Sequence, residues 1–148
     1  MARCADLPYL DKQGVTIGGR TVAQKGDNVT ASITVKLASL VNGGGIIPKL
    51  KLVQLISGPV TGPATDKDTI FAPQTTVTES YTVSETSGTV TFTHTWKNVQ
   101  GDFYLRFRGG DGNNVDANGN PKMDVMGNAS PWADLWFYTN PIFVSVIK

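Results

Sequence analysis

Alternation of apolar and polar residues with a period of two is the feature that most constrains the fold of this chain. Between Val29 and Leu37 every odd position is apolar and every even position is polar. Successive side chains of a β-strand point to opposite faces, so this pattern gives the segment one apolar and one polar face. An α-helix, with about 3.6 residues per turn, would scatter the same apolar residues around its circumference. The segment is therefore predicted to be a half-buried strand.

The same alternation recurs in later segments of the chain. It runs through residues 77–83, with Glu79 as the one break, and through residues 89–96 and 103–108. Residues 50–56 are more uniformly apolar, which indicates a strand that is either central in its sheet or bent. The final run, from Ile142 to Ile147, predicts a closing strand with both faces largely covered.

Turn residues separate these segments. Glycine supplies a positive φ angle, and Asn or Asp side chains bond back to the nearby backbone. Turns are predicted at residues 18–19, 25–28, 42–45, 57–59, 87–88 and 100–102. Short strands with regular turn signals predict an all-β fold, an antiparallel two-sheet sandwich of immunoglobulin or fibronectin type III character with about seven strands. The 148 residues fit a single domain, 1–148, in which only residues 131–137 could form one helical turn.

Charge and composition argue against several classes of protein. Thirteen basic and twelve acidic residues leave a net charge of +1, so there is no basic excess for nucleic-acid binding. No stretch approaches the roughly 18 to 20 apolar residues that span a bilayer. The single cysteine, Cys4, excludes an internal disulfide. Residues 1–10 lack the apolar core of a signal peptide, which indicates either a removed leader or a chain cut from a longer parent.

Groups that could form a catalytic site are scarce. His94 is the only histidine, and the alternation places its side chain on the same strand face as Phe92 and Trp96. We therefore expect a core or rim histidine that is bonded to a neighbour. No nucleophile elbow, metalloprotease, phosphate-loop or paired-cysteine motif occurs. The carboxylates are scattered through turns without a distinctive spacing. We therefore expect no enzyme activity from this chain alone.

Residues 109–136 form the one long segment without any period, and a loop of that length in a compact domain is usually functional. It offers oxygen ligands of the kind that Ca²⁺ prefers, and no other cofactor is expected. The candidate ligands are Asp111, Asn113, Asp116, Asn118 and Asp124. The match to a calcium-binding EF-hand loop is incomplete, because Pro121 stands where glycine belongs and no glutamate closes the loop. Turn formation by Asn and Asp is the alternative explanation.

A second group of candidates consists of aromatic and basic residues. Trp96, Trp132 and Trp136 could stack on sugar rings if they are exposed, whereas buried tryptophans would pack the long loop onto the sheets. Arg106 and Arg108 lie on the polar face of their strand and could hold an anion. The alternative for both arginines is solvated surface or cross-strand pairing with acidic residues.

The end of the chain resembles that of a known family. The stretch from Trp132 to Val144 reads WADLWFYTNPIFV and is similar to the ending of secreted bacterial phosphoesterases of the PHP (polymerase and histidinol phosphatase) type. Residues 26–30, 57–62, 93–96 and 101–106 are similar to the β-domain that follows the catalytic domain in that family. The family's metal ligands lie in the catalytic domain and have no counterparts here. The resemblance therefore implies a C-terminal accessory β-sandwich domain and carries over no catalytic residue.

Three hypotheses for the function follow from these observations. The first is a non-catalytic accessory domain of a secreted, extracellular bacterial hydrolase, whose partner is a catalytic domain of the same parent chain. The second is an autonomous module that binds carbohydrate or another protein through residues 109–136. The third is a structural subunit of a cell-surface assembly, in which edge strands and a free terminal strand pair between copies.

Overall fold

The computed structural model describes residues 2–5, 15–69, 72–112 and 136–148. Throughout this described part the regular structure consists of strands, and none of it forms a helix that could cross a membrane. The strands are β1 (Ala2–Ala5), β2 (Arg20–Gln24), β3 (Val29–Lys36), β4 (Leu52–Pro59), β5 (Thr76–Thr82), β6 (Thr89–Trp96), β7 (Phe103–Gly110), β8 (Trp136–Tyr138) and β9 (Ile142–Ile147). The predicted all-β class is confirmed, with more strands than expected.

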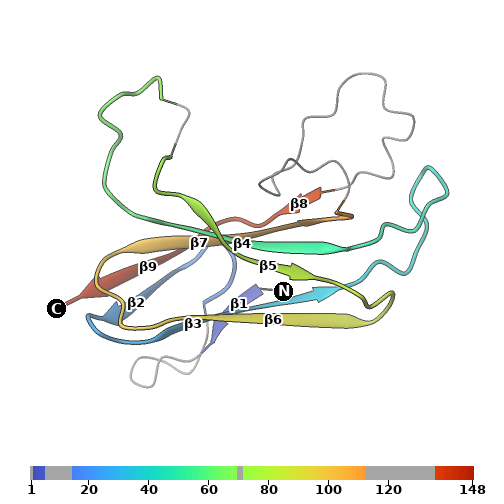
Figure 1. The fold of residues 1–148 in the computed structure, drawn as a ribbon, viewed down its shortest axis with the longest axis horizontal. Coiled ribbons are helices and arrows are strands. Elements are labelled where there is room, and N and C mark those ends of the chain that lie inside the picture. Colours follow the sequence, from blue (N-terminus) through green and yellow to red (C-terminus); the bar gives the residue numbers. More distant parts are fainter. Residues whose placement is uncertain (1, 6–14, 70–71, 113–135) are drawn as a thin grey trace.

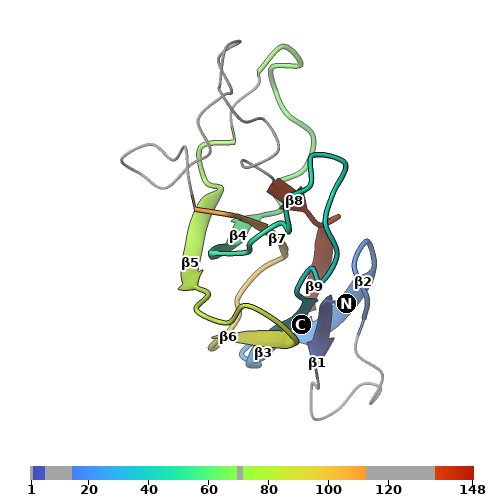
Figure 2. The same cartoon turned by 90° about the vertical axis from the view of Figure 1, so that its right-hand side faces the viewer.

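The strands form two sheets that lie one above the other. The larger sheet has the order β2-β9-β7-β4-β5, with β8 paired to β7, and the smaller has the order β1-β3-β6. Strands β3 and β6 lie beneath β4 and β7 in both Figure 1 and Figure 2. The view in Figure 2 also places β5 and β6 together at one side of the molecule.

The prediction of a purely antiparallel arrangement is wrong at one edge of the larger sheet. Strand β2 pairs with β9 in parallel, from Arg20 opposite Phe143 to Gln24 opposite Ile147. Strand β9 pairs on its other side with β7 in antiparallel fashion. The terminal strand is therefore not free to pair with another copy, because it lies between two strands of its own sheet.

The core lies between the two sheets and uses the inward positions of the alternating segments. The side chains of Leu55 and Leu105 are fully buried, and Phe107 is 1% exposed. The smaller sheet contributes the apolar face predicted for residues 29–37, of which Val29, Ala31, Ile33 and Leu37 are buried. Strand β4 is central, as one of the two alternatives predicted, and its pairing with β5 also has a register shift between Leu55 and Ile56.

Three predicted local features differ from the structure. Residues 57–59 are the end of strand β4 and not a turn. Gly58 is required there by close packing, since a Cβ atom would lie 2.7 Å from Thr75 Oγ1 and 3.2 Å from a ring carbon of Tyr104. The aperiodic segment does not begin at Gly109, because that residue belongs to β7. The proposed helical turn is also wrong at Phe137, which lies in β8, while residues 131–135 lie outside the described part.

Candidate functional site

The side of the molecule where β5 and β6 meet is less tightly closed than the core. Strand β5 is an edge of the larger sheet and β6 is an edge of the smaller one. The inward side chains of β6 beyond Val90, which are Phe92, His94 and Trp96, are therefore only half-buried. Tyr81 of β5 covers part of this row by stacking on Phe92, with ring centroids 4.8 Å apart.

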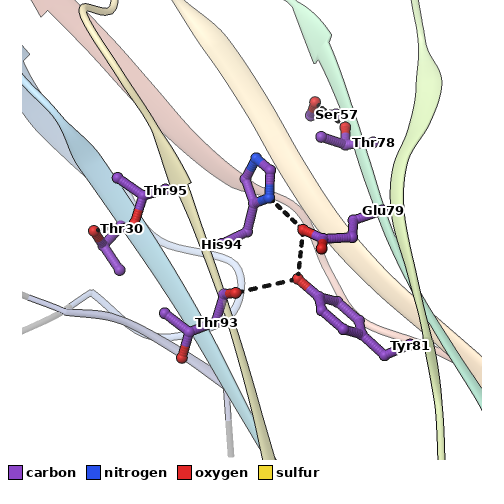
Figure 3. A network of polar contacts seen from close by, with 8 residues as sticks. All are labelled: Thr30, Ser57, Thr78, Glu79, Tyr81, Thr93, His94 and Thr95. Atoms are coloured by element: carbon purple, nitrogen blue, oxygen red, sulfur yellow. Dashed lines mark hydrogen bonds and ion pairs between the residues drawn. The ribbon is translucent and has the colours of Figure 1, made fainter.

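A polar bridge joins the two sheets at this side. Figure 3 shows the imidazole of His94 and the phenol of Tyr81 converging on the carboxylate of Glu79. His94 Nδ1 lies 2.5 Å from Glu79 Oε2, and the Tyr81 hydroxyl donates to the same oxygen at 3.0 Å. The Tyr81 hydroxyl also lies 3.3 Å from the carbonyl oxygen of Thr93. The predicted interpretation of His94 as a rim histidine bonded to a neighbour is confirmed.

The bridge shifts the protonation equilibria of two of its members. The hydrogen bond from His94, followed by that from Tyr81, lowers the pKa of Glu79 below its ordinary value. Burial, followed by the hydrogen bond to the Glu79 carboxylate, raises the pKa of the Tyr81 phenol. At neutral pH the bridge therefore contains a carboxylate and a neutral phenol.

The geometry of the bridge resembles half of a nucleophilic triad, in which a carboxylate orients the histidine ring. The second half would be a hydroxyl bonded to His94 Nε2, and no such bond occurs among the described residues. The hydroxyls of Ser57 and Thr78, drawn in Figure 3, are bonded to each other at 2.5 Å. The described contacts of the bridge link β5 of the larger sheet to β6 of the smaller one.

A groove of about 430 Å³ begins next to the bridge. Its walls are the end of β4, the start of β5, the end of β6, the start of β7 and the turn at residues 97–102. Trp96 and Phe103 supply aromatic surface with ring centroids 5.2 Å apart, and Trp96 also meets the ring of His94 at 4.5 Å. Gln74 and Gln100 add planar amides to the lining.

Hydrogen bonds within the turn and to neighbouring segments hold the wall of the groove formed by residues 97–102. Asn98 has a positive φ of 54°, and its backbone N–H donates to the Asn28 side chain at 3.0 Å. Gln100 Nε2 donates to Asn98 Oδ1 at 2.6 Å. Asp102 Oδ1 accepts from the Val146 N–H at 2.7 Å, which ties the turn to strand β9. A wall built in this way is preorganised, so binding a ligand would cost little ordering entropy.

The predicted calcium ligands lie almost entirely outside the described residues. Asn113, Asp116, Asn118 and Asp124 belong to the segment 113–135. Asp111 is described and is partly buried. In the described ranges no three His, Cys, Asp or Glu residues are grouped so as to hold a metal ion. The cation loop therefore stays a prediction.

Besides Trp96, which lines the groove, the predicted aromatic and basic ligand residues whose side chains are described are Arg106 and Arg108. Trp132 lies outside the described residues, and Trp136 pairs through its backbone with Gly110 in the β7–β8 ladder. Arg106 is partly buried, with its guanidinium carbon 5.8 Å from the ring centroid of Tyr138.

The alternative of a solvated Arg108 is wrong, because this residue is only 7% exposed. Its Nε donates to Gln54 Oε1 at 2.7 Å, and Gln54 Nε2 donates in turn to Ser80 Oγ at 3.1 Å. Arg108 therefore belongs to a polar row that crosses β7, β4 and β5, and this row supplies its guanidinium with a hydrogen-bond acceptor.

Two parts of the candidate site were not identified from the sequence. The alternation marks Glu79 only as a break, although a charged residue in line with apolar ones is a signal for a polar partner on a facing strand. The groove combines residues from three separate stretches of the chain, 57–59, 74–76 and 96–103, and no local sequence pattern predicts that they come together. Comparison with protein-family models, with curated proteins and with solved structures finds no match for this chain.

Proposed function

We propose that this chain is a non-catalytic binding module whose groove beside Trp96 takes a carbohydrate. The observation that carries the proposal is the groove itself, in which a half-buried indole lies among planar amides. Sugar rings present C–H groups on their faces and hydroxyls at their edges. An aromatic wall matches the first, and Gln or Asp side chains match the second. A volume of about 430 Å³ falls within the range of small-molecule sites.

The fold proposed for this module is an immunoglobulin-like β-sandwich, and its setting is a secreted bacterial hydrolase. The stretch that resembles the PHP-type ending supports this setting. Its residues 136–144 form β8 and the start of β9 in the larger sheet. An ending with this structural role fits an accessory domain that holds or positions a substrate for a catalytic domain of the same parent chain. Phosphoesterase turnover by the purified chain would contradict this assignment.

The binding proposal is tested by calorimetric titration of the chain with a panel of soluble oligosaccharides. We expect one or more members to bind, and Trp96→Ala to weaken that binding by about five- to 150-fold, because the aromatic contact is worth about 1 to 3 kcal/mol. Gln74→Ala, at the exposed rim, should weaken it less. Tyr138→Ala is the matched aromatic control, since Tyr138 is 53% exposed and lies outside the groove.

Two outcomes would contradict the carbohydrate proposal. One is the absence of binding across the panel by a chain whose melting is cooperative. The other is equal loss of binding in Trp96→Ala and Tyr138→Ala. Circular dichroism of each variant separates loss of the site from loss of the fold, and Gln74→Ala provides a groove variant that leaves the half-buried indole in place.

A further inference from the structure

The loop between β3 and β4 exposes a cluster of aliphatic side chains at the end of the molecule opposite the groove. It projects beyond the strand ends at the right of Figure 1. The exposed aliphatic residues are Leu40 at 79%, Val41 at 62%, Ile46 at 37% and Ile47 at 45%. Single exposed apolar residues are ordinary, but four of them gathered on one loop indicate a binding surface.

Hydrogen bonds hold this loop in a defined turn. Asn42 Oδ1 accepts from the backbone N–H groups of Gly44 at 2.9 Å and Ile46 at 3.1 Å. The Asn42 N–H donates to the Ile46 carbonyl at 2.8 Å, and Gly45 adopts a positive φ of 75°. The turn places the two aliphatic pairs on either side of residues 42–45. The hydrogen-bonded turn therefore holds these aliphatic side chains in their exposed positions.

The base of the loop is basic. Two small, mainly apolar cavities of about 230 and 220 Å³ lie beneath it, and Lys36, Lys49 and Lys51 are among their lining residues. Glu85 is the acidic side chain found in those linings. All three lysines are exposed. The loop thus combines exposed aliphatic side chains with three exposed lysines near its base.

We infer that this loop docks on an anionic lipid surface, with Leu40, Val41, Ile46 and Ile47 entering the leaflet and the lysines meeting the headgroups. Apolar burial and electrostatic attraction between lysines and anionic headgroups add in such docking. A protein partner fits less well, because a stable interface needs roughly 800 Å² per partner and is usually anchored by Trp, Tyr or Arg. Four aliphatic side chains on one loop offer neither.

The inference is independent of the carbohydrate proposal, since it uses the opposite end of the strands. An eight-residue strand such as β3 is about 25 Å long. A chain docked through residues 38–47 would therefore hold the Trp96 groove away from the lipid and open to solvent.

The test is co-sedimentation of the full chain with vesicles of phosphatidylcholine alone and of phosphatidylcholine with phosphatidylglycerol at three to one. We expect binding to the anionic vesicles that weakens as salt is raised. The double variant Leu40→Asp/Ile47→Asp should lower the bound fraction by more than about tenfold. Lys49→Glu/Lys51→Glu should remove the preference for anionic vesicles. Val60→Asp is the control, because Val60 is also exposed, at 43%, but lies outside this loop.

Three results would overturn the inference. The first is no sedimentation with either vesicle. The second is equal loss in Val60→Asp and in the loop variant. The third is a concentration-dependent dimer in size-exclusion chromatography that the loop variant abolishes, which would assign the surface to a second copy of the chain. Because all the substituted side chains are exposed, these variants should keep the wild-type melting temperature within a few degrees.

Discussion

At the scale of the single residue, Glu79 is the most informative side chain in the molecule. It interrupts the apolar face of β5, and the interruption is explained by two partners, His94 and Tyr81, that reach it from both sheets. The His94 side chain is 22% exposed and that of Glu79 is 43% exposed, so solvent screens the pair. Exposed ion pairs contribute about 0 to 1 kcal/mol. The bridge therefore adjusts stability modestly and in a pH-dependent way.

We predict that Glu79→Gln removes part of the acid sensitivity of the fold. Because hydrogen bonding lowers the pKa of Glu79 in the folded state, its contribution to stability is present above the ordinary carboxyl range and is lost as pH falls through the lowered pKa. The glutamine variant should melt lower by up to about 2 to 4 °C at pH 7 and should converge with the wild type as the pH falls below the lowered pKa of Glu79. Thermal melts across this pH range measure the difference.

Glu85→Gln is the matched control for this prediction. The Glu85 carboxylate accepts hydrogen bonds from its neighbour Ser84, at 3.2 Å from the backbone N and 3.4 Å from Oγ. Its removal should leave the pH dependence of melting close to that of the wild type. If both variants changed the profile equally, the bridge would have no special role in acid stability.

The position of a side chain could be predicted where it depends only on the alternation within its own strand. His94 was placed correctly, because strand parity fixes which face a side chain occupies. For Arg108 the alternative of a solvated side chain is wrong, because the residue is buried and bonded to Gln54, which bonds in turn to Ser80, and these partners lie on two other strands. The partners of Glu79 and the groove lining come from several strands, so their combination depends on strand order, which single-residue patterns do not contain.

At the scale of elements, the junction of β4, β7 and β8 depends on a residue without a side chain. Gly109 lies opposite Val53 of β4 and opposite Phe137 of β8. A Cβ atom at this position would lie 2.6 Å from a ring carbon of Phe137 and 2.9 Å from the Leu52 carbonyl oxygen. The backbone oxygen cannot move aside without disturbing the ladder. Glycine is therefore required here for close approach.

We predict that Gly109→Ala lowers the free energy of unfolding by about 1 to 3 kcal/mol, the usual cost of overpacking. Gly101→Ala is the control, because a Cβ atom there meets nothing within 4 Å and the backbone has an ordinary φ. Its effect should stay within about 0.5 kcal/mol. Urea unfolding at neutral pH measures both values. If Gly109→Ala were as stable as the control, β8 would have to shift to accommodate the added methyl group, and the close approach would not require glycine.

The strands differ in how well their sequences predicted them. Strands β3, β6, β7 and β9 follow from alternation or from a continuous apolar run. Strands β1 and β2 were not predicted, since their sequences, Ala2–Ala5 and Arg20–Gln24, are short and alternate weakly. The parallel pairing of β2 with β9 was also missed. Pairing partners far apart in the chain are selected by the assembled sheet, and no short window of sequence contains that information.

At the scale of the whole molecule, the last strand joins segments from the two ends of the chain. Strand β9 lies between β2 and β7, so it connects residues 20–24 with the central part of the larger sheet. Asp102, in the wall of the groove, is also bonded to this strand. The architecture therefore makes the groove depend on a strand that forms no part of its lining.

We predict that a chain ending at Pro141, which lacks β9, does not fold cooperatively. Ile142 and Val144 are 2% and 1% exposed, and burying each contributes about 1.5 to 3 kcal/mol. Their sum, about 3 to 6 kcal/mol, reaches the lower end of the total stability of about 5 to 15 kcal/mol typical of a domain, and β2 would lose its pairing partner as well. Circular dichroism melts measure the loss. A chain lacking only the exposed Lys148 is the control, and equal cooperative melting of the two chains would mean that β9 is dispensable.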